Sequence, residues 1–217
     1  MSRWYPLMLN LEGRRCVVIG GGSVAERKIS GLLEAGAAVS VFSLGLTEHL
    51  RELVHAGKIE WAKRPMQDED LDGAALVFAA TDRQDINAQA AQAARARGIH
   101  ANVADDGAGG DFIVPAVLRR GDLIVTASTS GAAPALAARV VNEMAVRYGP
   151  EYAEYVKVLE TVRSIVKSEV EDSSERRKLL NAAVTEDALE EWRSASWLQD
   201  KGKLVERLRQ RANYTRG

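Results

Sequence analysis

The chain has 217 residues, of which 46% are apolar, and a formal net charge of −1 from 29 basic and 30 acidic side chains. This is enough apolar sequence for a full domain with a smaller appendage, and the balanced charge gives no general attraction to nucleic acid or to an anionic membrane. One cysteine and three scattered histidines argue against a disulfide and a Cys/His metal site, and the lack of any apolar signal or membrane-spanning run predicts a cytoplasmic protein.

Short apolar runs alternate with helical patterns through the first hundred residues. The expected strand and helix pairs are Cys16–Ile19 with Val24–Glu34, Val39–Phe42 with Thr47–His55, and Leu76–Ala79 with Asp82–Arg97, and another strand begins at His100. Thr47 and Asp82 are expected N-caps, and Gly36, Gly57 and Gly98 are expected helix ends. Such alternation is typical of parallel strands joined by crossover helices, so we predict an α/β fold.

The stretch VVIGGGSVA joins the first expected strand to its helix. Gly20, Gly22 and Ala25 stand at the G-x-G-x-x-A spacing, which predicts a Rossmann-like dinucleotide site. Gly20 would permit the tight turn, Gly22 would let a pyrophosphate reach the helix N-terminus, and Ala25 would allow the helix to pack closely. A glycine-rich turn without a ligand is the alternative. The predicted cofactor-binding residues are Gly20, Gly22, Ser23, Val24, Ala25, Ser43 and Thr81.

The second expected strand ends at Ser43, where many dinucleotide sites carry an acidic residue that binds the adenosine ribose. An arginine that could pair with a 2′-phosphate does not follow directly either. The cofactor choice is therefore weakly determined, and we expect NAD to be preferred over NADP.

The chain after residue 110 changes character. Two further strands are expected at Phe112–Leu118 and Leu123–Ala127, joined by a turn at RRGD, and Pro134 suits the first turn of the next helix. Beyond Pro150 glycines become rare and charged helical patterns take over. We therefore predict a Rossmann domain at 1–112, a short β-containing central region for dimerisation and substrate binding at 113–148, and a helical domain at 149–217.

A stripe of apolar residues marks the first helix of this last region. Its members are Tyr152, Tyr155, Val156, Leu159, Val162 and Val166. The stripe looks too large to be buried within a short segment, so we expect a second copy of the chain to cover it in a homodimer.

The segments YPLMLNLEGRRCVVIGGGSVAERK, VFAATD, NVADD and GDFIVPAVLRRGDLIVTASTSGAAPALA, in this order, resemble precorrin-2 dehydrogenase, the NAD-dependent module of sirohaem synthase. The likeness covers roughly residues 3–148. It implies oxidation of the tetrapyrrole precorrin-2 to sirohydrochlorin with NAD, and in some members insertion of ferrous iron. It also implies a homodimer with C-terminal helices.

Two polar segments are the substrate-site candidates. Asp105 in NVADD matches an important aspartate of the family and would be the catalytic base, with Asn102 beside it as a substrate-binding residue; the alternative is that this segment merely forms a turn. The second segment would bind substrate carboxylates near a helix start, although helix capping alone would also explain it. Its residues are Ser128, Thr129, Ser130 and Gly131.

Two other functions stay open. One is a Rossmann dehydrogenase for another small substrate, which the absence of a Tyr-x-x-x-Lys pair disfavours. The other is a non-catalytic dinucleotide sensor, which would need the glycine turn but would have no use for NVADD and STSG together.

Overall fold

The computed structural model describes residues 4–104, 109–194 and 200–214. The chain divides into two compact units. The first unit is Met1–Val114 together with Ser130–Ala132, and the second is Pro115–Thr129 together with Ala133–Gly217.

The first unit is built on a parallel sheet of five strands in the order β3-β2-β1-β4-β5. The strands are β1 (Arg15–Ile19), β2 (Ala38–Phe42), β3 (Glu60–Ala62), β4 (Leu76–Ala79) and β5 (His100–Val103). The central strands are mostly apolar, apart from Arg15 at the start of β1 and Ser40 in β2, as is typical of strands whose two faces are both covered by helices. The strand order reverses between β1 and β4, and open α/β sheets bind ligands beyond the carboxyl ends of the strands at such a point. The predicted α/β class is confirmed.

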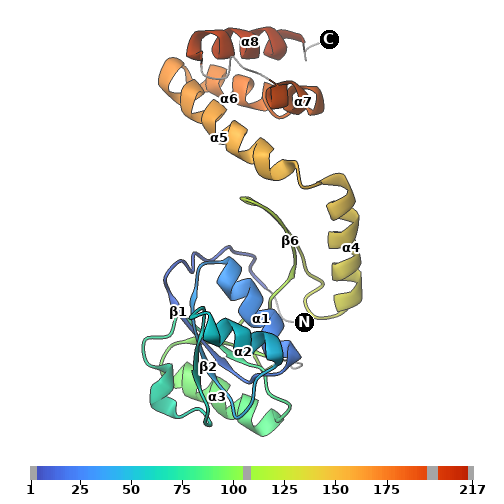
Figure 1. Ribbon diagram of the computed structural model, residues 1–217. Helices are drawn as coiled ribbons and strands as arrows, with labels where there is room; N and C mark the ends of the chain where they lie inside the picture. The colour runs from blue at the N-terminus through green and yellow to red at the C-terminus, as the bar shows by residue number, and fades with distance from the viewer. Residues whose placement is uncertain (1–3, 105–108, 195–199, 215–217) are drawn as a thin grey trace. The chain divides into compact units, whose positions relative to one another are not determined.

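Helices cover the two faces of this sheet (Figure 1). α1 (Ser23–Glu34) and α2 (Glu48–His55) pack on one face with Cys16 and Val18 of β1. α3 (Gln84–Ala96) and the short 3-10 helix η1 (Asp68–Leu71) pack on the other face with Val17 and Ile19. The alternation of β1 side chains between the two cores follows from the period of two in a strand.

The helix-end predictions are confirmed except at one position. The Thr47 side chain accepts from the Leu50 N–H at 3.3 Å and caps α2. Gly36, Gly57 and Gly98 follow helix ends with positive φ angles. The Asp82 cap is wrong: α3 begins at Gln84 with Arg83 as N-cap, because the Thr81 hydroxyl bonds the Arg83 backbone and keeps this turn out of the helix.

The second unit begins with an antiparallel hairpin of β6 (Ala116–Arg120) and β7 (Leu123–Ala127), joined at Gly121 and Asp122. The turn at RRGD is thus confirmed, whereas the strand expected from Phe112 is wrong in its bounds. Phe112 instead packs edge-on against Phe78 of β4, with ring centroids 5.4 Å apart. α4 (Pro134–Arg147) packs on the hairpin and starts at Pro134 as predicted.

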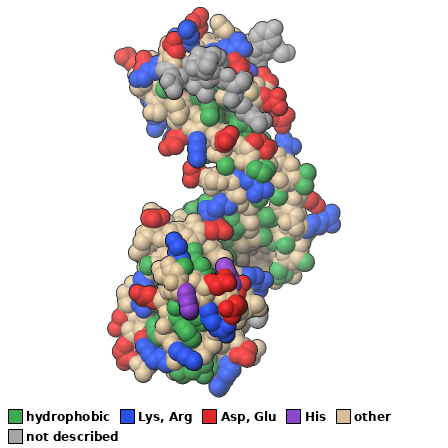
Figure 2. Space-filling model, viewed as in Figure 1, with side chains coloured by type: hydrophobic (Ala, Val, Ile, Leu, Met, Phe, Trp, Pro, Cys, Tyr) green, Lys and Arg blue, Asp and Glu red, His purple; other side chains and the backbone are tan. Residues whose placement is uncertain are grey.

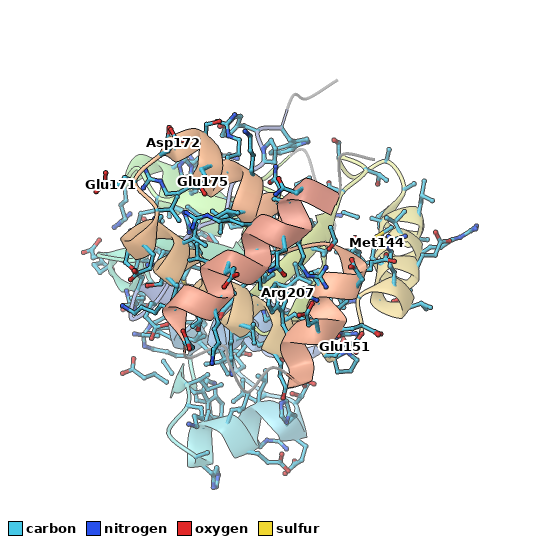
Figure 3. All side chains as sticks on the ribbon, turned by 90° about the horizontal axis from the view of Figure 1, so that it is seen from above. Met144, Glu151, Glu171, Asp172, Glu175 and Arg207 are labelled. Carbon is cyan, nitrogen blue, oxygen red and sulfur yellow. The ribbon has the colours of Figure 1, made fainter. Side chains whose placement is uncertain are left out.

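Four helices complete the second unit. They are α5 (Tyr152–Glu169), α6 (Ser173–Ala182), α7 (Glu186–Ser194) and α8 (Lys201–Tyr214). In Figure 3, Asp172 and Glu175 lie at the start of α6, where the Asp172 carboxylate caps the helix by accepting from the Glu175 N–H at 2.6 Å.

The apolar stripe of α5 is covered in part by the chain itself. Tyr155, Val162 and Val166 are buried in one core with residues of α6, α7 and α8, among them the fully buried Trp192. The Trp192 indole donates to the Ala183 carbonyl at 2.9 Å. The folded-back helices α6 to α8 supply this apolar surface, whereas Tyr152 and Leu159 are only partly buried against the core and Val156 is not among the residues packed on it. The chain itself thus buries part of the stripe, and cover of the remainder by a second copy stays a prediction.

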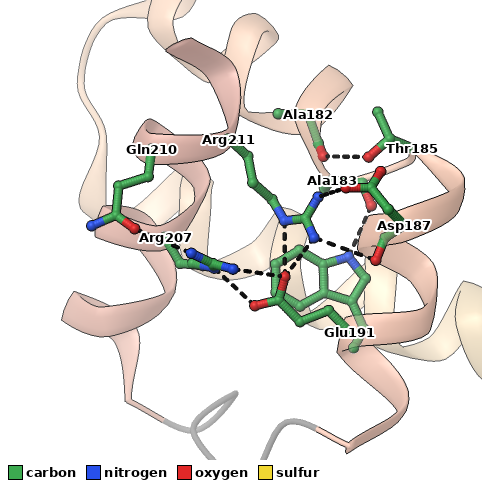
Figure 4. A network of polar contacts seen from close by, with 9 residues as sticks. Ala182, Ala183, Thr185, Asp187, Glu191, Arg207, Gln210 and Arg211 are labelled. Atoms are coloured by element: carbon green, nitrogen blue, oxygen red, sulfur yellow. Dashed lines mark hydrogen bonds and ion pairs between the residues drawn. The ribbon is translucent and has the colours of Figure 1, made fainter. Parts of the chain in front are cut away.

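Ion pairs tie α7 to α8 at the surface of this core (Figure 4). Glu191 binds both Arg207 and Arg211, and Arg211 also binds Asp187 at 2.6 Å. The Arg207–Glu191 distance is 2.8 Å. The network links residues 16 to 24 positions apart, so it fixes how the last two helices pair.

The face of the molecule seen in Figure 2 carries acidic and basic side chains interspersed, as the net charge of −1 leads one to expect. Among the residues that the structure describes, no helix combines the length and the apolar character needed to cross a bilayer.

Candidate functional site

The glycine turn lies between β1 and α1, at the point where the strand order reverses. Gly20 has a φ of +121°, and a Cβ there would overlap the Ala80 carbonyl oxygen and lie 2.7 Å from the Ala80 carbonyl carbon. Only glycine lets β1 leave the sheet this close to the loop after β4. The tight-turn role predicted for Gly20 therefore has a concrete cause.

Gly21 is packed against the loop between β2 and α2. A Cβ there would overlap the Gly45 carbonyl and lie 2.8 Å from both the Ser43 hydroxyl and a Leu46 methyl. The Gly21 carbonyl also accepts from the Thr47 N–H at 2.9 Å. The sequence pattern assigned no role to Gly21, although it stands inside the glycine triplet.

Gly22 differs from both neighbours because the space beside it is open. A Cβ at Gly22 would meet no atom within 4 Å, and its φ of −88° is an ordinary extended value. Gly22 is the N-cap of α1, and no side chain caps this helix in the described part of the chain. The N–H groups of Ser23, Val24 and Ala25 therefore lack an acceptor within the helix and face a position suited to an anion.

Ala25 is the last residue of the G-x-G-x-x-A pattern and lies on the face of α1 that packs on the sheet. It is fully buried in the core that α1 shares with β1 and β2. A larger side chain would push the start of α1 away from the sheet. The packing role predicted for Ala25 agrees with this position.

Ser43 follows β2 and shapes the loop there. Its hydroxyl donates to the Gly45 carbonyl at 2.6 Å and accepts from the Gly45 N–H at 3.3 Å. The next residues of the loop are held by Thr47, whose hydroxyl bonds the Glu26 carboxylate on α1. Ser43 thus lies beside Gly21, and its assignment to the cofactor stays a prediction.

Thr81 follows β4 and faces the turn from the opposite side. Its backbone N lies 3.2 Å from the position that a Gly20 Cβ would take. The buried amide of Asn87 on α3 binds both the backbone and the hydroxyl of Thr81. Asn87 was missed by sequence reasoning, although an asparagine inside an alanine-rich helix is an unfavourable choice that signals a specific hydrogen bond.

Asn102 lies at the carboxyl end of β5 and is 6% exposed. Its Nδ2 donates to the Phe112 carbonyl at 2.9 Å, while its buried Oδ1 has no hydrogen-bond partner among the residues that the structure describes. Asn102 as a substrate-binding residue stays a prediction. Asp105, the expected catalytic base, lies outside the described residues.

Asp111 anchors the chain segment that returns to β5. Its carboxylate accepts from the Ala101 N–H at 3.0 Å and pairs with Arg95 at 2.8 Å, and its own N–H donates to the Ala101 carbonyl at 2.7 Å. Partial burial would raise the pKa of Asp111, but the Ala101 N–H and the Arg95 guanidinium outweigh it and lower this pKa. Sequence reasoning missed Asp111 because its partners are ten or more residues away.

The STSG segment leads into α4. The Thr129 hydroxyl accepts from the Ala133 N–H at 2.9 Å. Ala133 is itself the N-cap of α4, and no side chain caps this helix among the described residues, so the bond holds the loop before the helix and is not a helix cap. Ser130 has a φ of +55° and Gly131 one of +86°, so two consecutive residues adopt left-handed backbone. Ser130 and Gly131 belong to the unit that holds the glycine turn, whereas Ser128 and Thr129 belong to the second unit. Their role in substrate binding stays a prediction.

Metal ligands are not gathered in the ranges that the structure describes: no group of three His, Cys, Asp or Glu side chains is placed to hold an ion. The arrangement around the glycine turn is that of a dinucleotide site. It combines an open, uncapped helix start with a glycine turn at the carboxyl edge of a parallel sheet.

Comparisons with known proteins agree with this geometry. Siroheme synthase 1 of Aeromonas salmonicida is 36% identical over 187 residues, which is 86% of this chain and 40% of that protein. Siroheme synthase of Pseudomonas paraeruginosa is 38% identical over 172 residues, which is 79% of this chain and 37% of that protein. The chain thus spans about two fifths of the length of the curated relatives that it matches.

A solved structure, SirC, precorrin-2 dehydrogenase, superposes with a TM-score of 0.75 at 26% identity, covering 94% of this chain and all of that one. The resemblance found in the sequence is confirmed by these matches. The family model described as putative NAD(P)-binding matches residues 7–116, which include the glycine turn and the whole five-stranded sheet. The chain therefore belongs to this NAD(P)-binding family.

Proposed function

We propose that this chain oxidises precorrin-2 to sirohydrochlorin with NAD as the oxidant. The observation that carries the proposal is the likeness to a precorrin-2 dehydrogenase along 94% of this chain. The relatives named siroheme synthase support the same assignment.

The glycine turn fits a dinucleotide. Gly22 leaves open space next to three helix N–H groups, and Gly20 and Gly21 hold the loops after β4 and β2 against the turn. When bound there, NAD supplies the acceptor for the hydride that leaves the tetrapyrrole. The α1 N–H groups would bind the pyrophosphate and hold it at the sheet edge. Loss of the hydride leaves a proton to be removed from the substrate, and we assign this step to the Asp105 carboxylate.

We further propose that the active form is a homodimer. The hairpin of β6 and β7 has two strands, and α4 packs against it within the same unit. Val117 on β6, Leu136 at the start of α4 and Val146 near its end are 44%, 51% and 88% exposed. A second copy packed on this apolar surface would bury them. The cytoplasmic location expected from the sequence stays a prediction.

The test is an anaerobic assay of the purified chain with precorrin-2 and NAD. We expect NADH and sirohydrochlorin to appear together in equal amounts, each followed by its absorbance. Binding of NAD without any oxidation of precorrin-2 would leave a dinucleotide-binding protein of another function. In that case other reduced small substrates would be tested next.

A further inference from the structure

Asn87, a buried residue on the first turn of α3, forms three side-chain hydrogen bonds with one residue, Thr81. It is 3% exposed. Its Oδ1 accepts from the Thr81 N–H at 3.1 Å and lies 2.7 Å from the Thr81 hydroxyl. Its Nδ2 donates to the Thr81 carbonyl at 2.9 Å. The Thr81 backbone offers one donor and one acceptor, so this pairing also fixes which amide atom is oxygen.

This arrangement is unfavourable for α3 taken alone. Asparagine is a poor helix former, and a buried amide costs stability unless its hydrogen bonds are made. The neighbouring positions of α3 on the same core are filled by small apolar residues such as Ala90, Ala91 and Ala94. The polar side chain of Asn87 therefore stabilises the loop after β4 through its hydrogen bonds to Thr81.

That loop forms one wall of the glycine turn. The Ala80 carbonyl occupies the place where a Gly20 side chain would stand, and the Thr81 N lies 3.2 Å from that same point. We propose that Asn87 is a positioning residue for the dinucleotide: it fixes the Ala80–Thr81 backbone against Gly20 and so holds the turn in the form that accepts the pyrophosphate. This inference rests on the NAD binding contained in the proposed function.

The hydrogen bonds from Asn87 also determine which Thr81 groups are available to a ligand. The Thr81 N–H and carbonyl are both bonded to Asn87, and the hydroxyl is shared between Asn87 and the Arg83 backbone. The pyrophosphate is therefore bound by the α1 N–H groups, while Thr81 contributes shape. Asn87 touches neither the proposed substrate nor the turn itself, so its effect reaches the cofactor only through Thr81.

The experiment compares full-length wild type with Asn87→Leu, which keeps the size of the side chain and removes all three hydrogen bonds. Affinity for NAD is measured by calorimetry, without tetrapyrrole. We expect the Kd for NAD to rise about tenfold or more. In turnover with precorrin-2, KM for NAD should rise while kcat at saturating NAD stays within about twofold, because Asn87 acts on cofactor placement. Hydrogen exchange at the Thr81 amide should become faster.

Ser40→Ala is the matched control. Ser40 is a buried polar residue in the middle of β2, bonded to Glu60 and Arg15, away from the turn. Ser40→Ala should lower the melting temperature but leave the Kd for NAD within about twofold of the wild-type value. The inference is refuted if wild type binds NAD and Asn87→Leu binds it within about twofold of wild type. If Asn87→Leu does not fold, Asn87→Ala, which also removes the three hydrogen bonds and matches the small residues beside it on α3, decides by the same limit. A wild type that binds NAD but leaves precorrin-2 unchanged refutes the proposed function and leaves this comparison intact.

Discussion

Gly20 and Gly22 stand two residues apart in the same turn, yet the structure predicts opposite consequences for substituting them. Gly22 is extended and has open space where a side chain would stand. Gly22→Val should therefore cost only the N-cap preference for glycine, about 1 kcal/mol, and lower the melting temperature by about 2–4 °C. The fold should persist with its helical content unchanged.

The same valine would fill the space that the pyrophosphate needs. Losing two charge-assisted hydrogen bonds to the α1 N–H groups is worth roughly 3 kcal/mol, which corresponds to about a hundredfold increase in the Kd for NAD. Gly22→Val should thus separate cofactor binding from folding. Calorimetric titration with NAD and a thermal melt without it measure the two quantities on one sample.

Gly20→Ala is the matched comparison. Its Cβ would overlap the Ala80 carbonyl, and its φ of +121° is strained for any side chain. Overpacking and backbone strain together should cost about 3 kcal/mol and lower the melting temperature by about 6–12 °C. The reasoning is refuted if Gly22→Val binds NAD within threefold of wild type, roughly 0.6 kcal/mol, or destabilises the chain as much as Gly20→Ala.

Four further outcomes are expected. Asp105→Asn should reduce the rate of precorrin-2 oxidation on the order of 10²-fold with NAD affinity unchanged, and a near-normal rate would remove Asp105 from the mechanism. Titration with NAD and with NADP should give tighter binding of NAD, since Ser43 offers no charge to a 2′-phosphate. Tighter binding of NADP would contradict this. Lys63, which follows β3 beside the end of β2, would then be the first residue to replace. The pKa of Asp111 is lowered in the folded protein, so its ionised carboxylate stabilises the fold. This stabilisation is complete above the ordinary aspartate pKa of about 3.9. It is lost as the pH falls through the lower pKa that Asp111 has in the folded state. Acid unfolding of Asp111→Asn should lack this contribution, and an acid transition unchanged from wild type would contradict it. Light scattering at micromolar concentration should give the mass of a dimer, and a monomer mass would overturn the homodimer.

Much of the first unit was predictable because its signals are local. The apolar runs of β1, β2 and β4, the Thr47 cap and the G-x-G-x-x-A spacing each depend on residues that are close in sequence. A helix start needs only its own cap, and a parallel strand needs only an apolar run between turn residues. β3 was missed because Glu60–Ala62 is too short to show a period.

Tertiary structure decided the rest, since the contacts involved join residues that no local pattern connects. The strand predicted at Phe112–Leu118 is replaced at its start by contacts of Phe112 with Phe78 and Asn102, and β6 begins only after Pro115. Three residues of the α5 stripe, Tyr155, Val162 and Val166, are buried by helices that lie later in the same chain.

The glycine triplet shows the division within one motif. The sequence by itself determined that this turn needs bare backbone, because its spacing matches a strand, a turn and a helix start. Only the tertiary structure decided which atoms approach each glycine: the Ala80 carbonyl at Gly20, the Gly45 carbonyl at Gly21, and open space at Gly22. Glycine is compatible with all three surroundings. Which one each glycine has depends on loops that follow other strands, far away in the sequence.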